Sequence, residues 1–136
     1  MDERETQHSK ETVVMLRRLP TDQDAPATAR ALTHELLDGL EHNGSARDED
    51  LILSVSELVS NAVVHGPRGE LSVRLAAVDT VVRVEVSDRG RIPFAMPDGL
   101  GTNGHWGLGL VRQLSDRSGI ERRPWTVAWC EIDLAG

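Results

Sequence analysis

The sequence predicts an α+β fold, a two-layer α/β sandwich. About three helices cover one face of a mixed, mostly antiparallel sheet. Apolar residues recur every three or four positions through much of the first half of the 136-residue chain, the period of a helix with one buried face. In the second half they alternate with polar residues, the period of a strand with one buried face. Runs of helices beside hairpin-forming strands favour two packed layers.

Length and composition indicate one domain, residues 12–136, after a flexible N-terminal segment, residues 1–11. The chain carries 15 basic and 22 acidic residues, a net charge of −7, which argues against direct nucleic-acid binding. The single cysteine, Cys130, excludes an internal disulfide and a cysteine-based metal cluster, and we expect it to be buried in a strand. No stretch has the length of a membrane span and the N-terminus is polar, so we expect a cytoplasmic protein.

The first half predicts one strand and two helices. Residues 12–19 form a short edge strand that ends at Pro20. Asp24 is a candidate N-cap for a helix that ends near residues 43–44. Ser45 is a candidate N-cap for a second, central helix that ends at residues 65–67.

The second half predicts strands, a long loop and one further helix. Residues 71–76 and 82–86 alternate as two strands joined by a hairpin at residues 77–79, and Asp88 continues the buried phase of the second strand. Residues 89–106 have no period, and a loop of that length in a compact domain is commonly functional. A helix then runs to Gly119. Residues 120–122 and 126–134 read as two further strands, the latter central in the sheet.

Polar residues border the apolar stripe of the central helix. Glu57 and Asn61 are four positions apart and therefore share one face of that helix. They border a stripe formed by Leu51, Val55, Leu58, Val59, Ala62 and Val63. A carboxylate and an amide beside a core stripe either form hydrogen bonds with neighbouring protein groups or belong to a functional site.

The chemistry of these residues suits a nucleotide pocket. Glycines at 104–109 let backbone N–H groups approach an anion at a helix start. An amide oxygen such as that of Asn61 can ligate Mg²⁺, and Glu57 one turn away can accept a proton from a nucleophile. Asp88 can accept a hydrogen bond from an exocyclic amino group, which would select adenine. On these residues alone the structural interpretation stays open, because Gly-x-Gly turns and helical Glu and Asn are common.

Three motifs, in order, resemble those of a known superfamily. SELVSNAVVHG resembles the N box of the GHKL (Bergerat-fold) ATPases, VEVSDRG their first glycine box and GHWGLGLV their second. The resemblance covers nearly the whole chain. Within this superfamily, the chain is most similar to anti-sigma-factor serine/threonine kinases and to related histidine-kinase-like ATPase domains of actinobacterial regulators. The similarity rests on the short length, the motif ELVSNAVVHG and the segment LVRQLSDRSGI.

The resemblance implies ATP and Mg²⁺ as cofactors and assigns roles to particular residues. Asn61 corresponds to the Mg²⁺-binding asparagine, Glu57 to the general base that activates a serine hydroxyl of a protein substrate, and Asp88 to the aspartate that binds the adenine amino group. Residues 91–105 correspond to the ATP lid. The further residues implied to bind the nucleotide are Gly90, His105, Gly107, Leu108, Gly109, Leu110 and Thr126.

Three departures from the family pattern bear on phosphoryl transfer. Ile92 stands where the first glycine box has its second glycine, and Pro124 and Trp125 precede the last strand. His105 stands where the kinases tend to carry an arginine for the terminal phosphate, and an imidazole is a poorer anchor than a bidentate guanidinium. Transfer relies on positioning and charge stabilisation, so these changes affect transfer more than binding.

Two functions follow from the resemblance. The first is an ATP- and Mg²⁺-dependent serine/threonine kinase that phosphorylates an anti-anti-sigma (STAS-type) partner, holds a sigma factor, and so controls transcription. The second is a weakly active or inactive nucleotide-binding, or ATP-free, partner-switching module. We also expect a homodimer through the sheet face or through the first strand and helix. A histidine-kinase transmitter fragment is disfavoured, because no hairpin bearing a phosphorylatable histidine precedes the domain.

Overall fold

The structure is a computed structural model that describes residues 11–41, 45–88, 108–122 and 125–136. Five strands and three helices lie within these ranges. In chain order they are β1 (Glu11–Pro20), α2 (Ala25–Gly39), α3 (Ala46–His65), β2 (Glu70–Val78), β3 (Val81–Asp88), α5 (Leu108–Leu114), β4 (Arg117–Arg122) and β5 (Thr126–Asp133).

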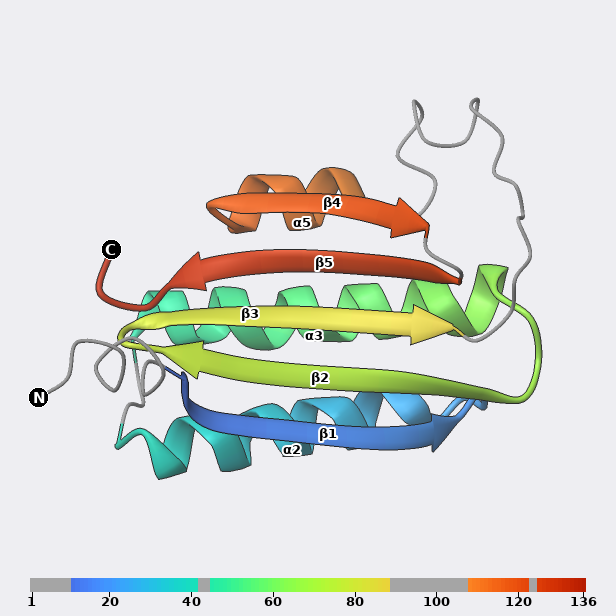
Figure 1. The fold of residues 1–136 in the computed structure, drawn as a ribbon, viewed down its shortest axis with the longest axis horizontal. Coiled ribbons are helices and arrows are strands. Elements are labelled where there is room, and N and C mark those ends of the chain that lie inside the picture. The colour runs from blue at the N-terminus through green and yellow to red at the C-terminus, as the bar shows by residue number, and fades with distance from the viewer. Residues whose placement is uncertain (1–10, 42–44, 89–107, 123–124) are drawn as a thin grey trace, which may run out of the picture.

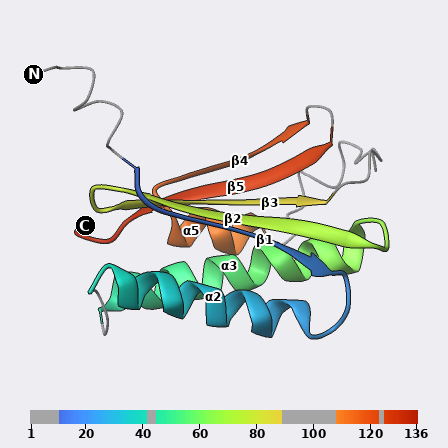
Figure 2. The same ribbon diagram turned by 60° about the horizontal axis from the view of Figure 1, so that its bottom comes forward.

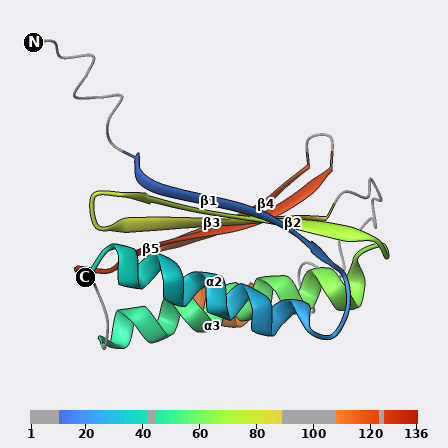
Figure 3. The same ribbon diagram turned by 90° about the horizontal axis from the view of Figure 1, so that it is seen from below.

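The strands form one sheet in the order β1-β2-β3-β5-β4, and every neighbouring pair of these strands is antiparallel. Figure 1 shows the sheet in front of the helices, and Figures 2 and 3 show α2, α3 and α5 together on one face. The predicted two-layer α+β sandwich is thus confirmed, with β1 at an edge as expected and β5 inside the sheet.

The strands follow the predicted alternation because each has one face under the helices. Val73, Val84 and Cys130 have side chains on this inner face and are buried, with Val84 paired to Cys130 across β3 and β5. The central helix supplies the opposite side of the core, and its predicted stripe is fully buried except at Val63, which is partly buried. Each fully buried aliphatic side chain contributes about 1.5–3 kcal/mol to folding.

The central helix α3 begins at a complete capping box. The Ser45 hydroxyl accepts a hydrogen bond from the Asp48 backbone N–H, and the Ser45 N–H donates to the Asp48 carboxylate. These two bonds satisfy N–H groups that the helix itself leaves unpaired. Ser45 was the predicted N-cap. Asp24, the other candidate, stands at the N-cap position of α2 but makes no side-chain capping bond.

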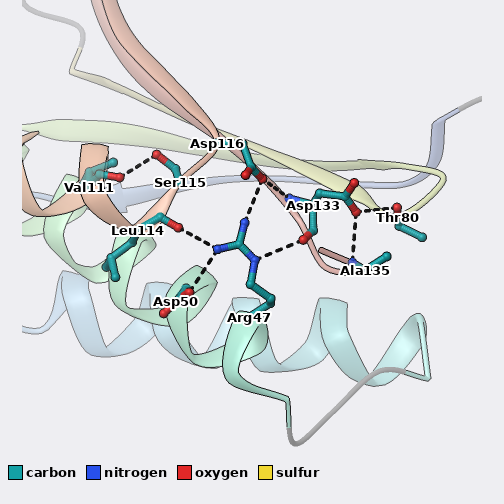
Figure 4. Close-up of polar contacts among 9 residues, drawn as sticks. All are labelled: Arg47, Asp50, Thr80, Val111, Leu114, Ser115, Asp116, Asp133 and Ala135. Carbon is teal, nitrogen blue, oxygen red and sulfur yellow. Dashed lines mark hydrogen bonds and ion pairs between the residues drawn. The ribbon is translucent and has the colours of Figure 1, made fainter.

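An arginine near the start of α3 joins three elements that are distant in the sequence (Figure 4). Arg47 donates to the Leu114 carbonyl at the end of α5, to the Asp133 carbonyl at the end of β5, and to the Asp116 carboxylate between α5 and β4. The same guanidinium pairs with Asp50 one turn later in α3. We name Arg47, Asp50, Asp116 and Asp133 the Arg47 junction.

Three predicted boundaries are corrected. The β2–β3 hairpin turns at Asp79–Thr80, where Asp79 has φ 57°, rather than at residues 77–79. The helix after the long loop ends at Leu114, not at Gly119, which lies inside β4 and faces the Trp129 ring. The first helix ends at Gly39, several residues before the predicted stop. Among the described helices, none is long and apolar enough to cross a membrane.

Candidate functional site

A cavity lies between the second half of α3 and the inner face of the sheet. The helix contributes one wall, and β3, β5 and β4 contribute the other, with Leu108 at the start of α5 beside them. The described residues that line it are Leu58, Asn61, Ala62, Val86, Asp88, Leu108, Ile120, Arg122, Thr126 and Ala128. Most are apolar, as is usual for small-molecule sites.

The strand register arranges the sheet wall in two rows. Ile120 pairs with Ala128, which pairs with Val86, and these three form an apolar row. The next row towards the strand ends is polar, since Arg122 pairs with Thr126. Asp88 lies at the level of Thr126 because the preceding pair is Ser87 with Val127. A flat heterocycle on the apolar row would therefore present its edge to the carboxylate of Asp88 and the hydroxyl of Thr126, with Arg122 beside it on β4.

Asp88 is held deep in the cavity by the end of α3. Its side chain is on the inner face as predicted and is 4% exposed. Gly66, the C-cap of α3, approaches it so closely that a Cβ at Gly66 would lie 3.2 Å from an Asp88 carboxylate oxygen. The same Cβ would lie 2.6 Å from the carbonyl oxygen of Ala62 in α3 itself, so the backbone at the end of this helix requires glycine.

Asn61 brings an unsatisfied amide to the helix wall. Its Nδ2 is buried and, within the described part of the chain, has no hydrogen-bond partner. A buried unpaired amide costs about 1–3 kcal/mol, so such an atom needs an explanation. The oxygen and nitrogen of an amide exchange places on rotation by 180°. The side chain can therefore offer the cavity either a donor or an acceptor, which fits a ligand or a hydrated cation.

The structure brings four of the predicted site residues together and leaves others apart. Asn61, Asp88, Leu108 and Thr126 line the cavity. Three predicted residues are described but do not line it: Glu57 is half-buried one turn before Asn61, and Gly109 and Leu110 lie at the exposed start of α5. Gly90, His105 and Gly107 lie outside the described residues, as do Ile92, Pro124 and the predicted lid, residues 91–105.

Sequence reasoning missed the wall provided by β4. Ile120 and Arg122 alternate with Glu121, so a strand assignment alone places both side chains on one face. The missing information was the pairing of β4 with β5, which sets that face towards the cavity. Arg122 is the one cationic side chain among the described residues that line the cavity.

Among the described residues, no three histidine, cysteine or carboxylate side chains gather into a group that could hold a metal ion. Mg²⁺ is commonly bound by one or two protein oxygens together with water and substrate phosphates. A single amide such as Asn61 therefore fits a metal that arrives with a nucleotide.

Comparison with known proteins agrees with this geometry. The model of the histidine kinase-like ATPase domain matches residues 19–127, which include every described cavity residue except Ala128. The chain belongs to this family of ATPase domains. The resemblance inferred from the three motifs is thus confirmed at the level of the family.

A solved structure is also similar: the crystal structure of the RsbU and RsbW domains of Rv1364c from Mycobacterium tuberculosis. The TM-score is 0.69 at 26% sequence identity, and the match covers 89% of this chain and 32% of that chain. This chain thus spans about a third of the length of the protein it matches. No curated protein matches the sequence.

Proposed function

We propose that this protein is an ATP-binding regulator of the anti-sigma-factor type and acts as a serine/threonine kinase on an anti-anti-sigma (STAS-type) partner. One observation carries the nucleotide site: one cavity is shared by the buried carboxylate of Asp88, an apolar row of strand residues, and the amide of Asn61, whose Nδ2 has no hydrogen-bond partner among the described residues. Membership of the ATPase family and the similarity to a structure that contains an RsbW domain support the regulatory class.

Five of the cavity residues have a proposed task in holding Mg·ATP. Asp88 accepts a hydrogen bond from the adenine amino group, and the row of Val86, Ala128 and Ile120 packs against the base. The Asn61 amide oxygen is a ligand for Mg²⁺. Bound Mg²⁺ supplies charge neutralisation of the phosphates.

Glu57 lies one helical turn before Asn61 and next to Leu58, which lines the cavity, but Glu57 itself does not line it. A half-buried carboxylate there can accept the proton of a serine hydroxyl presented by a second protein. The serine oxygen then bonds to the terminal phosphorus as the bond to ADP breaks. This placement suits a substrate that docks from outside the cavity.

A second candidate function is a partner-switching module that binds nucleotide without transferring phosphate. Glu57 is not one of the described residues that line the cavity. In the sequence, Ile92, His105 and Pro124 differ from the residues that the kinases carry at these positions. A sigma factor and the STAS-type partner would then compete for the protein by binding alone.

Self-association is part of the proposal. The face of the sheet opposite the helices carries Val14 and Leu16 on the edge strand β1, and these side chains are 46% and 59% exposed. We propose a homodimer through this face or through β1 and α2. Sedimentation equilibrium that shows a monomer at all accessible concentrations would remove this part of the proposal.

Calorimetric titration with Mg·ATP tests the nucleotide site. The wild type should bind, and Asn61→Ala should lose at least tenfold in Mg²⁺-dependent affinity because a metal ligand is removed. Gln113→Ala removes an exposed amide on α5 outside the cavity and should bind as the wild type does. Undiminished binding by Asn61→Ala would refute the metal role.

Phosphate transfer separates the two candidate functions. ATP labelled at its terminal phosphate is incubated with the protein and with STAS-type proteins encoded in the same genome. Transfer that is lost in Glu57→Ala and kept in Glu35→Ala, an exposed glutamate on α2, supports the kinase. Nucleotide binding and partner binding without transfer select the switching module.

A further inference from the structure

The cavity contains a charged group to which neither the family motifs nor the proposed function gives a role. Arg122 lies at the last position of β4, on the inner face, and lines the cavity with Ile120 two residues before it. Its side chain is exposed, and within the described part of the chain it makes no hydrogen bond or ion pair. A cation at the wall of a cavity, without a partner among the described residues, is available to a ligand.

The register sets Arg122 at one end of the cavity. Arg122 pairs with Thr126, and Thr126 lies at the level of Asp88, so the three residues stand in one row across β4, β5 and β3. Neighbouring strands are about 4.8 Å apart, so two strand spacings separate Arg122 from Asp88. This span is close to the width of a purine ring system. In Figure 2 the ends of β4 and β5 that carry Arg122 and Thr126 rise away from the helices.

The charge of Asp88 decides which part of a nucleotide this row can accept. A carboxylate repels phosphate groups at short range, more strongly where the surroundings are apolar. An uncharged heterocycle meets no such repulsion and offers the carboxylate an amino donor. The row therefore fits the base rather than the phosphates.

We propose that Arg122 is a base-binding residue, whose guanidinium plane covers the adenine ring on the side of β4. This inference rests on the proposed nucleotide site. A guanidinium stacks well on aromatic faces because it is planar and weakly hydrated, and its three methylene groups can cover the apolar row at Ile120. Such a contact contributes to affinity without contacting a phosphate.

The test measures dissociation constants for AMP, Mg·ADP and Mg·ATP with the wild type and Arg122→Gln. A contact with the base should weaken all three nucleotides by the same factor, about tenfold. Arg17→Gln is the matched control, since Arg17 is an exposed arginine on β1, the opposite edge of the same sheet. It should bind as the wild type does. Thermal unfolding confirms that each variant is folded.

Several results would overturn the inference. A loss that grows from AMP to Mg·ATP would assign Arg122 to the phosphates, and unchanged affinities would leave it without a role in binding. Arg122→Lys keeps the charge but not the planar group, so full affinity in that variant would show that charge alone acts there. If the wild type binds none of the three nucleotides, the proposed function fails, and this inference fails with it.

Discussion

Gly66 and Asp88 meet where the central helix ends and the third strand ends, and their approach fixes the depth of the cavity. The N–H of Gly66 donates to the Ala62 carbonyl at 2.9 Å, closing the helix directly above the carboxylate. No larger residue fits, because a Cβ would lie 2.6 Å from that carbonyl oxygen. The glycine at the end of the motif SELVSNAVVHG is thus required by steric constraints, whether or not a ligand binds.

Gly66→Ala is predicted to destabilise the fold by about 1–3 kcal/mol, because the end of α3 and the Asp88 side chain must shift to admit the methyl group. It should also weaken Mg·ATP binding, since the shift moves Asp88. Gly39→Ala is the control. Nothing lies within 4 Å of the Cβ it would add at the end of α2, and it should be neutral or slightly stabilising. Equal unfolding free energies for the two variants would contradict the steric account.

The buried thiol of Cys130 has a pKa shifted to alkaline pH. Burial in the sheet raises the pKa of its thiol from 9.0 to about 12, with Arg83 acting in the opposite direction. The unfolded chain therefore releases this proton at lower pH than the folded protein does. Stability is fully present below about pH 9 and is lost as the pH rises towards 12.

The predicted result is an unfolding free energy that falls by about 1.4 kcal/mol per pH unit in this window. The sequence makes the measurement clean, because it contains no tyrosine and its one lysine is Lys10. Cys130→Ala should remove most of the pH dependence. A decline of the same size in Cys130→Ala would show that another group is responsible.

The sequence predicts the position of a cavity residue where that position depends only on the periodicity of its own helix or strand. Asp88 continued the buried phase of a strand, and Asn61 bordered a helical stripe, so both faced the core as expected. Arg122 could not be assigned in this way, because its relevance depends on which strand pairs with β4. Glu57 shares a helix face with Asn61 yet does not line the described cavity, whereas Leu58, the next residue along the helix, does.

At the scale of elements, the Arg47 junction connects the start of α3 to the ends of α5 and β5 (Figure 4). Asp116 accepts from Arg47 at 2.8 Å and also from the Asp133 N–H at 2.7 Å, so the turn between α5 and β4 is held from both sides. The junction lies at the end of α3 opposite to Gly66. It therefore fixes the far end of the helix that carries Asn61.

Arg47→Ala is predicted to lower the unfolding free energy by about 2–3 kcal/mol, because two backbone carbonyls and two carboxylates lose a charged donor. Arg17→Ala, an exposed arginine on β1, should change it by less than about 0.5 kcal/mol. Denaturant unfolding of both variants is the measurement. A loss below 1 kcal/mol for Arg47→Ala would mean that the junction adds little.

Some ends of helices and strands can be predicted from local sequence patterns, and others cannot. The N-cap at Ser45 and the alternation in β2 and β3 agree with the sequence prediction, because both signals are local. Gly119 was misassigned as a helix end, since a glycine after a helical stripe normally marks a C-cap. In the structure Gly119 lies in β4 opposite Trp129 of β5. A Cβ at this position would lie 3.1 Å from the Trp129 ring, so glycine leaves room for the indole.

At the scale of the molecule, the order of helical and alternating segments was enough to predict the two-layer class. It was not enough to predict the order β1-β2-β3-β5-β4, because strand order depends on contacts between distant segments. That order makes the cavity: it inserts β5 between β3 and β4 and so sets Thr126 between Asp88 and Arg122.

We propose that one cavity, between α3 and the inner face of the sheet, binds Mg·ATP. Mapping of backbone amide NMR shifts during a Mg·ATP titration tests this directly. The largest changes among the described residues should occur at Asn61, Asp88, Thr126 and Ala128. Little change is expected at Arg74 and Arg83, which line a groove on the opposite face of the sheet. Shifts confined to that opposite face, or no shifts at saturating nucleotide, would contradict it.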